Sequence, residues 1–160
     1  MLDVACGSGR HLRWFAGRGH PVTGVDRADE AVRAAAAYGE VLQADIEGGP
    51  WPYAGRHFGG VVVTNYLWRP RLADIVAAVA PGGVLLYETF AAGNETVGKP
   101  SRPDFLLQPG ELIAACAGLR IVAYEDGFLH APARFVQRIA AVRAGETPWR
   151  ARLEGPAASR

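Results

Sequence analysis

The stretch that decides the fold is Met1-Leu2-Asp3-Val4-Ala5-Cys6-Gly7-Ser8-Gly9. It joins a short apolar run to a turn that contains two glycines, and residues 10–18 then follow a helical pattern that ends at Gly19. A Gly-x-Gly turn between a strand and a helix presents backbone N–H groups and a positive helix end to a ligand. The sequence therefore predicts a ligand site close to its first residues.

A second apolar run, residues 22–25, ends in Asp26. A carboxylate at the tip of the second strand can accept hydrogen bonds from both hydroxyls of a ribose. Dinucleotide-binding turns carry a third glycine three positions after the second one, and here that position is Leu12. The two features together predict a nucleoside-bearing cofactor and disfavour NAD or FAD.

The composition is that of one globular domain. The chain has 160 residues, 49% of them hydrophobic and 21% charged, with a formal net charge of +1. Such a balance gives no bulk field for nucleic acid or an acidic membrane, and no apolar run is long enough for a membrane helix. Two cysteines, Cys6 and Cys116, fit a reducing cytoplasm, and the four histidines lack metal-ligand spacing. We therefore expect a cytoplasmic protein without a metal site or signal peptide.

Apolar runs alternate with helical patterns, which predicts a parallel sheet covered by helices. We expect strands at residues 2–5, 22–25, 41–44, 60–64, 84–89, 119–124 and 135–142, and helices at 10–18, 28–38, 70–80 and 109–116. The connection before the last strand has about ten residues and no helical pattern, so that strand should be antiparallel. Residues 91–108 form a long irregular segment, which is typical of binding loops. One domain is expected over residues 1–144, followed by an irregular tail at 145–160.

Four motifs in this order resemble the class I S-adenosylmethionine-dependent methyltransferases. They are the glycine turn with Asp3, then Val25-Asp26, Gln43-Ala44-Asp45-Ile46 and Phe58 to Asn65, and the turn and strand at 81–86 are also similar. The resemblance covers about residues 2–142. It implies a Rossmann-like, doubly wound α/β sheet of seven strands, mostly parallel with an antiparallel last strand, in which the N-terminal cap helices of the family are missing. The turn and the small size are similar to bacterial tellurite-resistance and thiopurine-type methyltransferases.

The resemblance also implies S-adenosylmethionine as cofactor, with S-adenosylhomocysteine as product, and roles for single residues. Asp26 would bind the ribose, Asp45 the adenine amino group and Ile46 the adenine ring, while Asp3 would help to hold the methionine end. The remaining expected cofactor contacts are Ala5, Gly7, Gly9, Arg10, Asn65 and Tyr66. Structural alternatives stay open: Asp3 as a loop anchor, Asp26 as a helix N-cap, and Asp45 or Arg10 as solvated side chains.

Catalytic residues are harder to assign from the sequence. Tyr66 and Trp68 follow the fourth strand, where they either form a wall of the acceptor pocket or simply pack. Glu88 ends the fifth strand and is the candidate general base on position. Cys6 is interpreted as a small buried side chain rather than a nucleophile.

The predicted function is transfer of a methyl group to a small-molecule acceptor by in-line displacement. Alignment of the reactants is the main requirement of such a transfer, so no catalytic dyad need be visible in the sequence. Two alternatives stay open: a non-catalytic, methyltransferase-like binding or partner module, and a nicotinamide-dependent oxidoreductase. The sequence leaves the oligomeric state and the acceptor undetermined.

Overall fold

A computed structural model describes residues 1–146. Its strands are β1 (Leu2–Val4), β2 (Thr23–Asp26), β3 (Glu40–Gln43), β4 (Phe58–Thr64), β5 (Val79–Phe90), β6 (Arg120–His130) and β7 (Ala133–Val142). Its α-helices are α1 (Arg10–Ala16), α2 (Asp29–Ala35), α3 (Leu72–Ala77) and α4 (Glu111–Ala115), and short 3-10 turns lie at Arg69–Arg71, Asn94–Thr96 and Pro103–Phe105. The expected tail falls mainly on residues 147–160, which lie outside the described residues.

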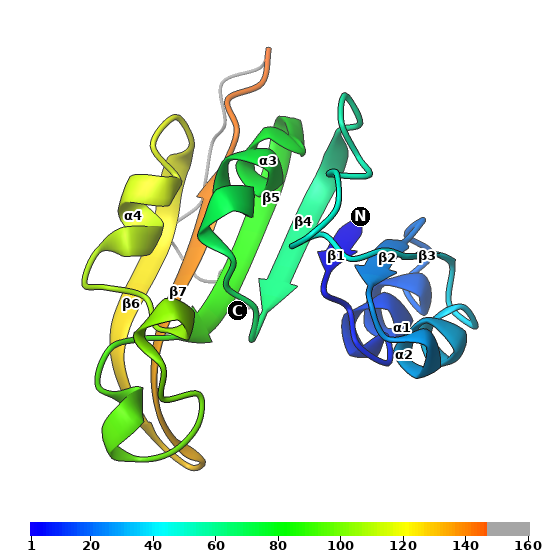
Figure 1. The fold of residues 1–160 in the computed structure, drawn as a ribbon. Coiled ribbons are helices and arrows are strands. Elements are labelled where there is room, and N and C mark those ends of the chain that lie inside the picture. Colours follow the sequence, from blue (N-terminus) through cyan, green and yellow to red (C-terminus); the bar gives the residue numbers. More distant parts are fainter. Residues whose placement is uncertain (147–160) are drawn as a thin grey trace, which may run out of the picture.

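All seven strands form one sheet in the order β3-β2-β1-β4-β5-β7-β6 (Figure 1). Strands β1 to β5 pair in parallel, whereas β7 pairs antiparallel with both β5 and β6. The predicted mixed sheet with an antiparallel last strand is therefore confirmed. Among residues 1–146, no helix has the length and apolar character needed to cross a membrane.

Two strands extend well beyond their predicted bounds. Strand β5 begins at Val79, which pairs with Phe58, although residues 79 and 80 were expected to end the helix at 70–80. It then passes through Pro81-Gly82-Gly83, which was expected to be a turn. A register irregularity of the β4–β5 pair takes up these residues. Strand β6 runs to His130 and turns at once into β7, so the expected ten-residue connection is instead a hairpin. Most side chains of β6 are exposed, so residues 125–127 show no apolar alternation that would predict a strand. Pairing with β7 in the hairpin sets the length of β6 instead.

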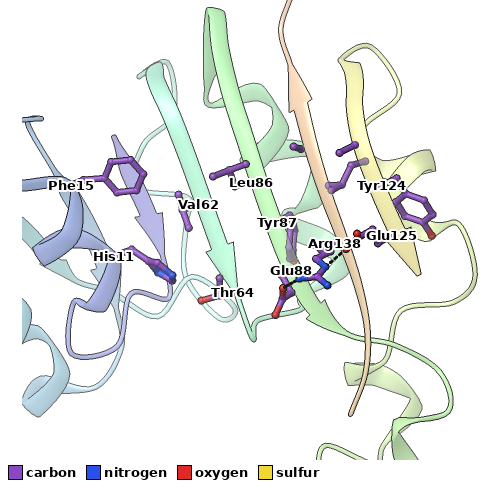
Figure 2. A pocket seen from close by; sticks show the side chains of 13 residues that line it. His11, Phe15, Val62, Thr64, Leu86, Tyr87, Glu88, Tyr124, Glu125 and Arg138 are labelled. Carbon is purple, nitrogen blue, oxygen red and sulfur yellow. Dashed lines mark ion pairs between the residues drawn. The ribbon is translucent and has the colours of Figure 1, made fainter. Parts of the chain in front are cut away.

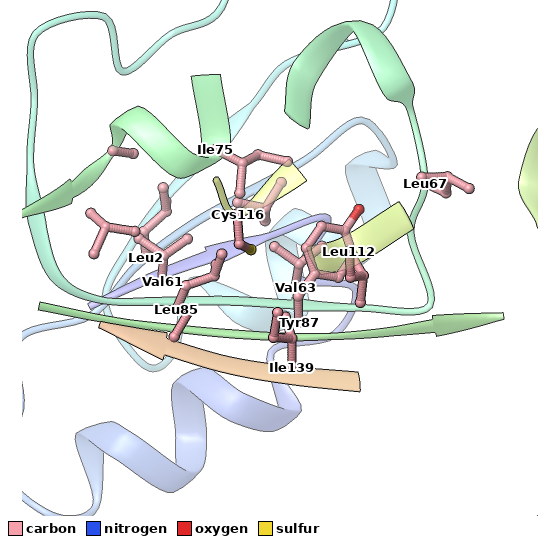
Figure 3. Close-up of a cluster of buried hydrophobic side chains, with 14 of the residues drawn as sticks. Leu2, Val61, Val63, Leu67, Ile75, Leu85, Tyr87, Leu112, Cys116 and Ile139 are labelled. Carbon is pink, nitrogen blue, oxygen red and sulfur yellow. The ribbon is translucent and has the colours of Figure 1, made fainter. Parts of the chain in front are cut away.

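The main core lies between the sheet and helices α3 and α4 (Figure 3). Side chains alternate across a strand, so Leu85 and Tyr87 of β5 point to this side together with Val61 and Val63 of β4. Ile75 of α3 and Leu112 of α4 complete the cluster from the helices. We call this side of the sheet the covered face.

The other side of the sheet carries α1 and α2, which pack near β1 to β3 in a smaller cluster of Cys6, Leu12, Val22 and Ala35. Over β4 to β7 this side is hollow, and we call it the open face. Leu86 of β5 points there and is 43% exposed, while its neighbour Leu85 on the covered face is fully buried. The two faces therefore differ strongly in how well the sheet is covered.

The long irregular segment at residues 91–108 is fixed at several points. The buried Asn94 side chain donates to the carbonyl of Pro100 and accepts from the backbone N–H of Phe135. Arg69 donates to the carbonyls of Asp104 and Leu106 and makes a two-pronged ion pair with Glu111 at the start of α4. These contacts hold the segment against β7 and α4.

Candidate functional site

The glycine turn after β1 has a backbone that few other sequences can adopt. Gly7 and Gly9 have φ angles of 52° and 83°, in the left-handed region that favours glycine. A Cβ on Gly9 would also lie 3.0 Å from the Cβ of Ala35 in α2, so this glycine allows the close approach of α1 and α2. Ala5 takes φ 54° without being glycine, a conformation that stores backbone strain at the end of β1.

Asp26 ends β2 and fastens this turn. Its Oδ2 accepts a hydrogen bond of 2.9 Å from the backbone N–H of Gly7, and its Oδ1 accepts one of 2.9 Å from the N–H of Ala28. Ala28 directly precedes α2, which begins at Asp29, so Asp26 also stabilises the start of this helix, as the N-cap alternative partly predicted. Each oxygen of the carboxylate keeps a further lone pair for a ligand.

A small cavity of about 130 Å³ opens beside Asp26 at the carboxyl edge of β1, β2 and β3. Three of the predicted residues line it from other elements, namely Asp45, Ile46 and Tyr66, and Ala5 completes its floor. Asp45 Oδ1 accepts from the backbone N–H groups of Glu47 and Gly48, which lower the pKa of this carboxyl. The cavity thus brings together predicted residues from the first three motifs and Tyr66, which follows the fourth; the predicted contacts Asp3, Gly7, Gly9, Arg10 and Asn65 do not line it.

The backbone is unusual again at the end of β4. Asn65 has φ 54°, and its N–H donates to the carbonyl of Glu88 on β5. Tyr66 follows, and its carbonyl accepts from the Tyr87 hydroxyl at 2.8 Å. The Tyr66 hydroxyl is buried and has no hydrogen-bond partner within residues 1–146, and its burial raises the pKa of the phenol. Residues with a left-handed backbone conformation, Ala5 and Asn65, therefore follow both β1 and β4 at the carboxyl edge of the sheet.

Asp3 lies on the open face beneath the first turn of α1. It is only 1% exposed, and its Oδ2 accepts no hydrogen bond from the described residues. The His11 Nδ1 is 3.4 Å from this oxygen, which is an ion-pair distance. On the other side of the imidazole, Arg10 Nη2 lies 3.3 Å from Nε2. Arg10 itself is exposed, so the solvated alternative for its side chain describes the present arrangement.

A larger hollow of about 400 Å³ occupies the open face next to this pair. Apolar walls come from Phe15, Val62, Leu86 and Ala140, and polar groups gather at the end where β4 and β5 finish (Figure 2). Glu88 lies there between two arginines of β7, with Arg134 Nη2 at 3.1 Å from Oε1 and Arg138 Nη1 at 3.6 Å from Oε2. Arg138 also contacts Glu125 of β6. Both oxygens of Glu88 are thus engaged by cations, which disfavours it as a free base.

Cys6 is buried against Gly24 and Leu12, within the cluster beneath α1. Burial, with the nearby charges of Asp3 and Asp26, raises the pKa of its thiol to about 12. A thiol with such a pKa is a poor nucleophile at neutral pH. This environment fits the interpretation of Cys6 as a small packing side chain.

Two features of the site were missed by the sequence analysis. The Asp3–His11 contact joins residues that are eight positions apart across the turn, and the cluster at Glu88 depends on the pairing of β5 with β7. In the second case the register sets Glu88 opposite Arg138. Antiparallel register is a long-range property, so no local signal could have found this pair. The carboxylate after Leu2 and the imidazole after Arg10 were both visible in the sequence, but no spacing rule relates the two residues.

Comparison with known proteins points to one family. The model of a methyltransferase domain family matches residues 1–83, just over half of the chain. A malonyl-[acyl-carrier protein] O-methyltransferase of Serratia marcescens is 36% identical over 100 residues, which are 59% of this chain and 39% of that protein. The chain thus matches about two fifths of the length of this curated relative.

Solved structures share the fold at low sequence identity. TehB from Haemophilus influenzae superposes with a TM-score of 0.70 at 17% identity, covering 89% of this chain and 57% of that one. A SAM-dependent methyltransferase from Methanosarcina mazei gives 0.65 at 17% identity and covers 91% and 92% of the two chains. Magnesium protoporphyrin IX methyltransferase from Synechocystis, solved with bound SAM, gives 0.63 at 16% identity over 89% and 69%. The chain therefore belongs to the class I S-adenosylmethionine-dependent methyltransferases, and S-adenosylmethionine is its cofactor.

Proposed function

We propose that this chain transfers a methyl group from S-adenosylmethionine to a small-molecule acceptor by in-line displacement. The observation that carries the proposal is Asp26, whose carboxylate is fixed by two backbone N–H groups at the rim of the cavity beside the glycine turn. A preorganised carboxylate at this place suits the two hydroxyls of a ribose. The small cavity lies at the carboxyl edge of the sheet, and the larger hollow on the open face reaches this edge at Thr64 and Glu88, so a cofactor and an acceptor would have neighbouring places.

The residues of the small cavity suit an adenosyl group. Ile46 offers an apolar surface for the adenine ring, and the Asp45 Oδ2 can accept from the amino group while its Oδ1 binds the turn. The buried Tyr66 hydroxyl has no partner among the described residues, so a ligand in the cavity would satisfy it. Ala5, Gly7 and Gly9 would supply backbone groups beside the sugar and sulfur, and the exposed Arg10 would be available to the carboxylate of the methionine tail.

Bound S-adenosylmethionine supplies a methyl group on a sulfonium, which is already a good leaving group. The task of the protein is then to align the acceptor and exclude water, and orientation alone can lower a barrier by about 7–11 kcal/mol. Asn65 and Tyr66 stand between the two cavities and would orient the acceptor. Tyr66 and Glu88 are the proposed catalytic residues, Glu88 serving as base only if its arginines release it.

A carrier-bound carboxylic acid is a second candidate acceptor. The relative from Serratia marcescens is named for malonyl-[acyl-carrier protein], and Arg138 of the open-face hollow is a group that could meet a carboxylate. Formation of S-adenosylhomocysteine with a malonyl carrier protein, compared with free small carboxylic acids, separates the two acceptors. The site of action in the cytoplasm and the absence of nucleic-acid and membrane partners stay predictions.

Calorimetric titration with S-adenosylhomocysteine tests the proposal. We expect binding to the wild-type chain and a loss of affinity of about tenfold or more in Asp26→Ala, because charge-assisted hydrogen bonds are removed. Asp29→Ala, which changes an exposed acid of the same region, is the matched control and should leave affinity unchanged. No binding by the wild type, with NADH binding in its place, would support the oxidoreductase instead. Binding without turnover of any acceptor would favour the non-catalytic module.

A further inference from the structure

We propose that His11, oriented by the buried Asp3, binds the carboxylate of the methionine tail of the cofactor. This inference rests on the proposed function, because it requires the adenosyl group to lie in the cavity beside Asp26. It gives His11 a role in cofactor binding, and it makes Asp3 a positioning residue that acts through this histidine.

The path of the cofactor follows from the order of the strands. The adenosyl cavity lies at β1, β2 and β3, while the acceptor hollow lies at β4 and β5. For its sulfur to face the hollow, a cofactor with its adenosyl group in the small cavity must extend along the turn at residues 5–9. Its amino-acid tail would then lie near the first residues of α1. His11 points from α1 toward the end of β4, beside Thr64 (Figure 2).

The contacts of the imidazole fix its proton. A guanidinium can only donate hydrogen bonds, so the His11 Nε2 accepts in its contact with Arg10, and the ring proton is on Nδ1. Nδ1 faces Asp3 Oδ2 at 3.4 Å, and this carboxylate is buried with that oxygen otherwise unpaired. An unpaired buried carboxylate is costly and stabilises a cation beside it. Asp3 therefore orients the ring, with Nδ1 toward the carboxylate and Nε2 toward Arg10.

A carboxylate is the anion that this arrangement suits. Once protonated on both nitrogens, His11 donates from Nδ1 to Asp3 and from Nε2 to the ligand, while the exposed Arg10 can turn to the same ligand group. Glu88, Glu125 and Arg138 are the other charged residues that line the hollow, and Arg138 is paired with both carboxylates. Among residues 1–146, the exposed Arg10 makes no ion pair with a carboxylate, so its guanidinium beside His11 is available to a ligand anion.

The test compares two ligands that differ only in the tail. S-adenosylhomocysteine carries the amino acid, whereas 5′-methylthioadenosine keeps the nucleoside thioether and lacks it. In calorimetric titrations of the full chain, His11→Phe should weaken S-adenosylhomocysteine by about tenfold to a hundredfold, the range of a charge-assisted hydrogen bond, and change 5′-methylthioadenosine less than about twofold. His11→Gln, which keeps a donor near the Nε2 position, should recover part of the loss. Asp3→Asn should give a smaller loss with the same preference for the tailed ligand.

His20→Phe is the control, because His20 lies just beyond the other end of α1 and packs on Phe15. It should change neither affinity. Equal weakening of both ligands in His11→Phe, or of neither, would overturn the role of His11, and His11→Gln gives the same decision if the phenylalanine variant does not fold. Failure of the wild type to bind either ligand would instead defeat the proposed function. Equal wild-type affinity for the two ligands would leave that function standing and defeat the inference.

Discussion

The two faces of the sheet differ in how they are covered and in the side chains they carry. On the covered face, apolar side chains of β4 and β5 pack against α3 and α4 in one continuous core. On the open face, His11, Glu88 and Arg138 line a hollow whose walls are partly exposed. Stability therefore resides mainly on one side of the strands, and polar chemistry on the other. Because side chains alternate along a strand, neighbouring residues of β5 belong to these two environments.

The largest difference should be visible in the pair Leu85 and Leu86. Leu85→Ala removes a fully buried side chain from the covered face and should lower the free energy of unfolding by about 2–5 kcal/mol. Leu86→Ala, on the open face, should cost less than about 1 kcal/mol, because the side chain is already 43% exposed. Urea unfolding midpoints of the two variants measure the difference. Equal losses would mean that the open face is covered in solution.

The two cysteines provide a comparison that leaves the sequence intact. Burial raises the pKa of Cys6, beneath α1, to about 12 and that of Cys116, in the covered core, to about 11, from a reference of 9.0. The thiolate fraction at pH 8 should then fall by roughly three and two orders of magnitude. Alkylation by iodoacetamide in the folded chain should be slower by similar factors than in urea. Fast reaction of Cys6 alone would show that the cluster beneath α1 opens easily.

Arginines on the two sides should also differ. Arg69 joins Glu111 through two hydrogen bonds of 2.7 and 2.9 Å and also binds two carbonyls, so Arg69→Ala should lower the free energy of unfolding by about 1–2 kcal/mol. Arg138→Ala removes a more exposed ion pair and should cost at most about 1 kcal/mol. Thermal unfolding of both variants compares them. A larger loss of stability in Arg138→Ala would show that ion pairs on the open face contribute more to the free energy of unfolding than the contacts of Arg69 do.

The smallest effect is expected at Asp45, on the edge between the faces. Backbone N–H groups of Gly48 and Glu47 lower its pKa from 3.8, so its contribution is present above that value and is lost as the pH falls through the lower folded pKa. Asp45→Asn should therefore be slightly less stable than the wild type at about pH 6, and the difference should shrink as the pH falls below 3.8. Urea midpoints across this pH range provide the measurement. A gap that widens on acidification would contradict the sign.

Local patterns predicted the parallel half of the molecule well. The residues of the glycine turn, the acid after β2 and the apolar run of β4 all lie where expected, because short-range rules govern a strand, a tight turn and a cap. The prediction was less accurate at Pro81-Gly82-Gly83, which the structure accommodates within β5, and at residues 125–130, which extend β6. In both places pairing with a distant strand outweighed local preference.

The sequence by itself determined the glycine turn and the seven-stranded mixed sheet, and it predicted the cofactor-binding roles of Asp26 and Asp45, because glycine dihedrals and strand periodicity are local properties of the chain. Only the tertiary structure decided what surrounds those acids. It brought His11 over Asp3, placed Glu88 opposite Arg138 through the β5–β7 register, and left one face of β4 to β7 open. Burial and charge pairing depend on residues far apart in the chain, and for that reason they follow from packing and not from any motif.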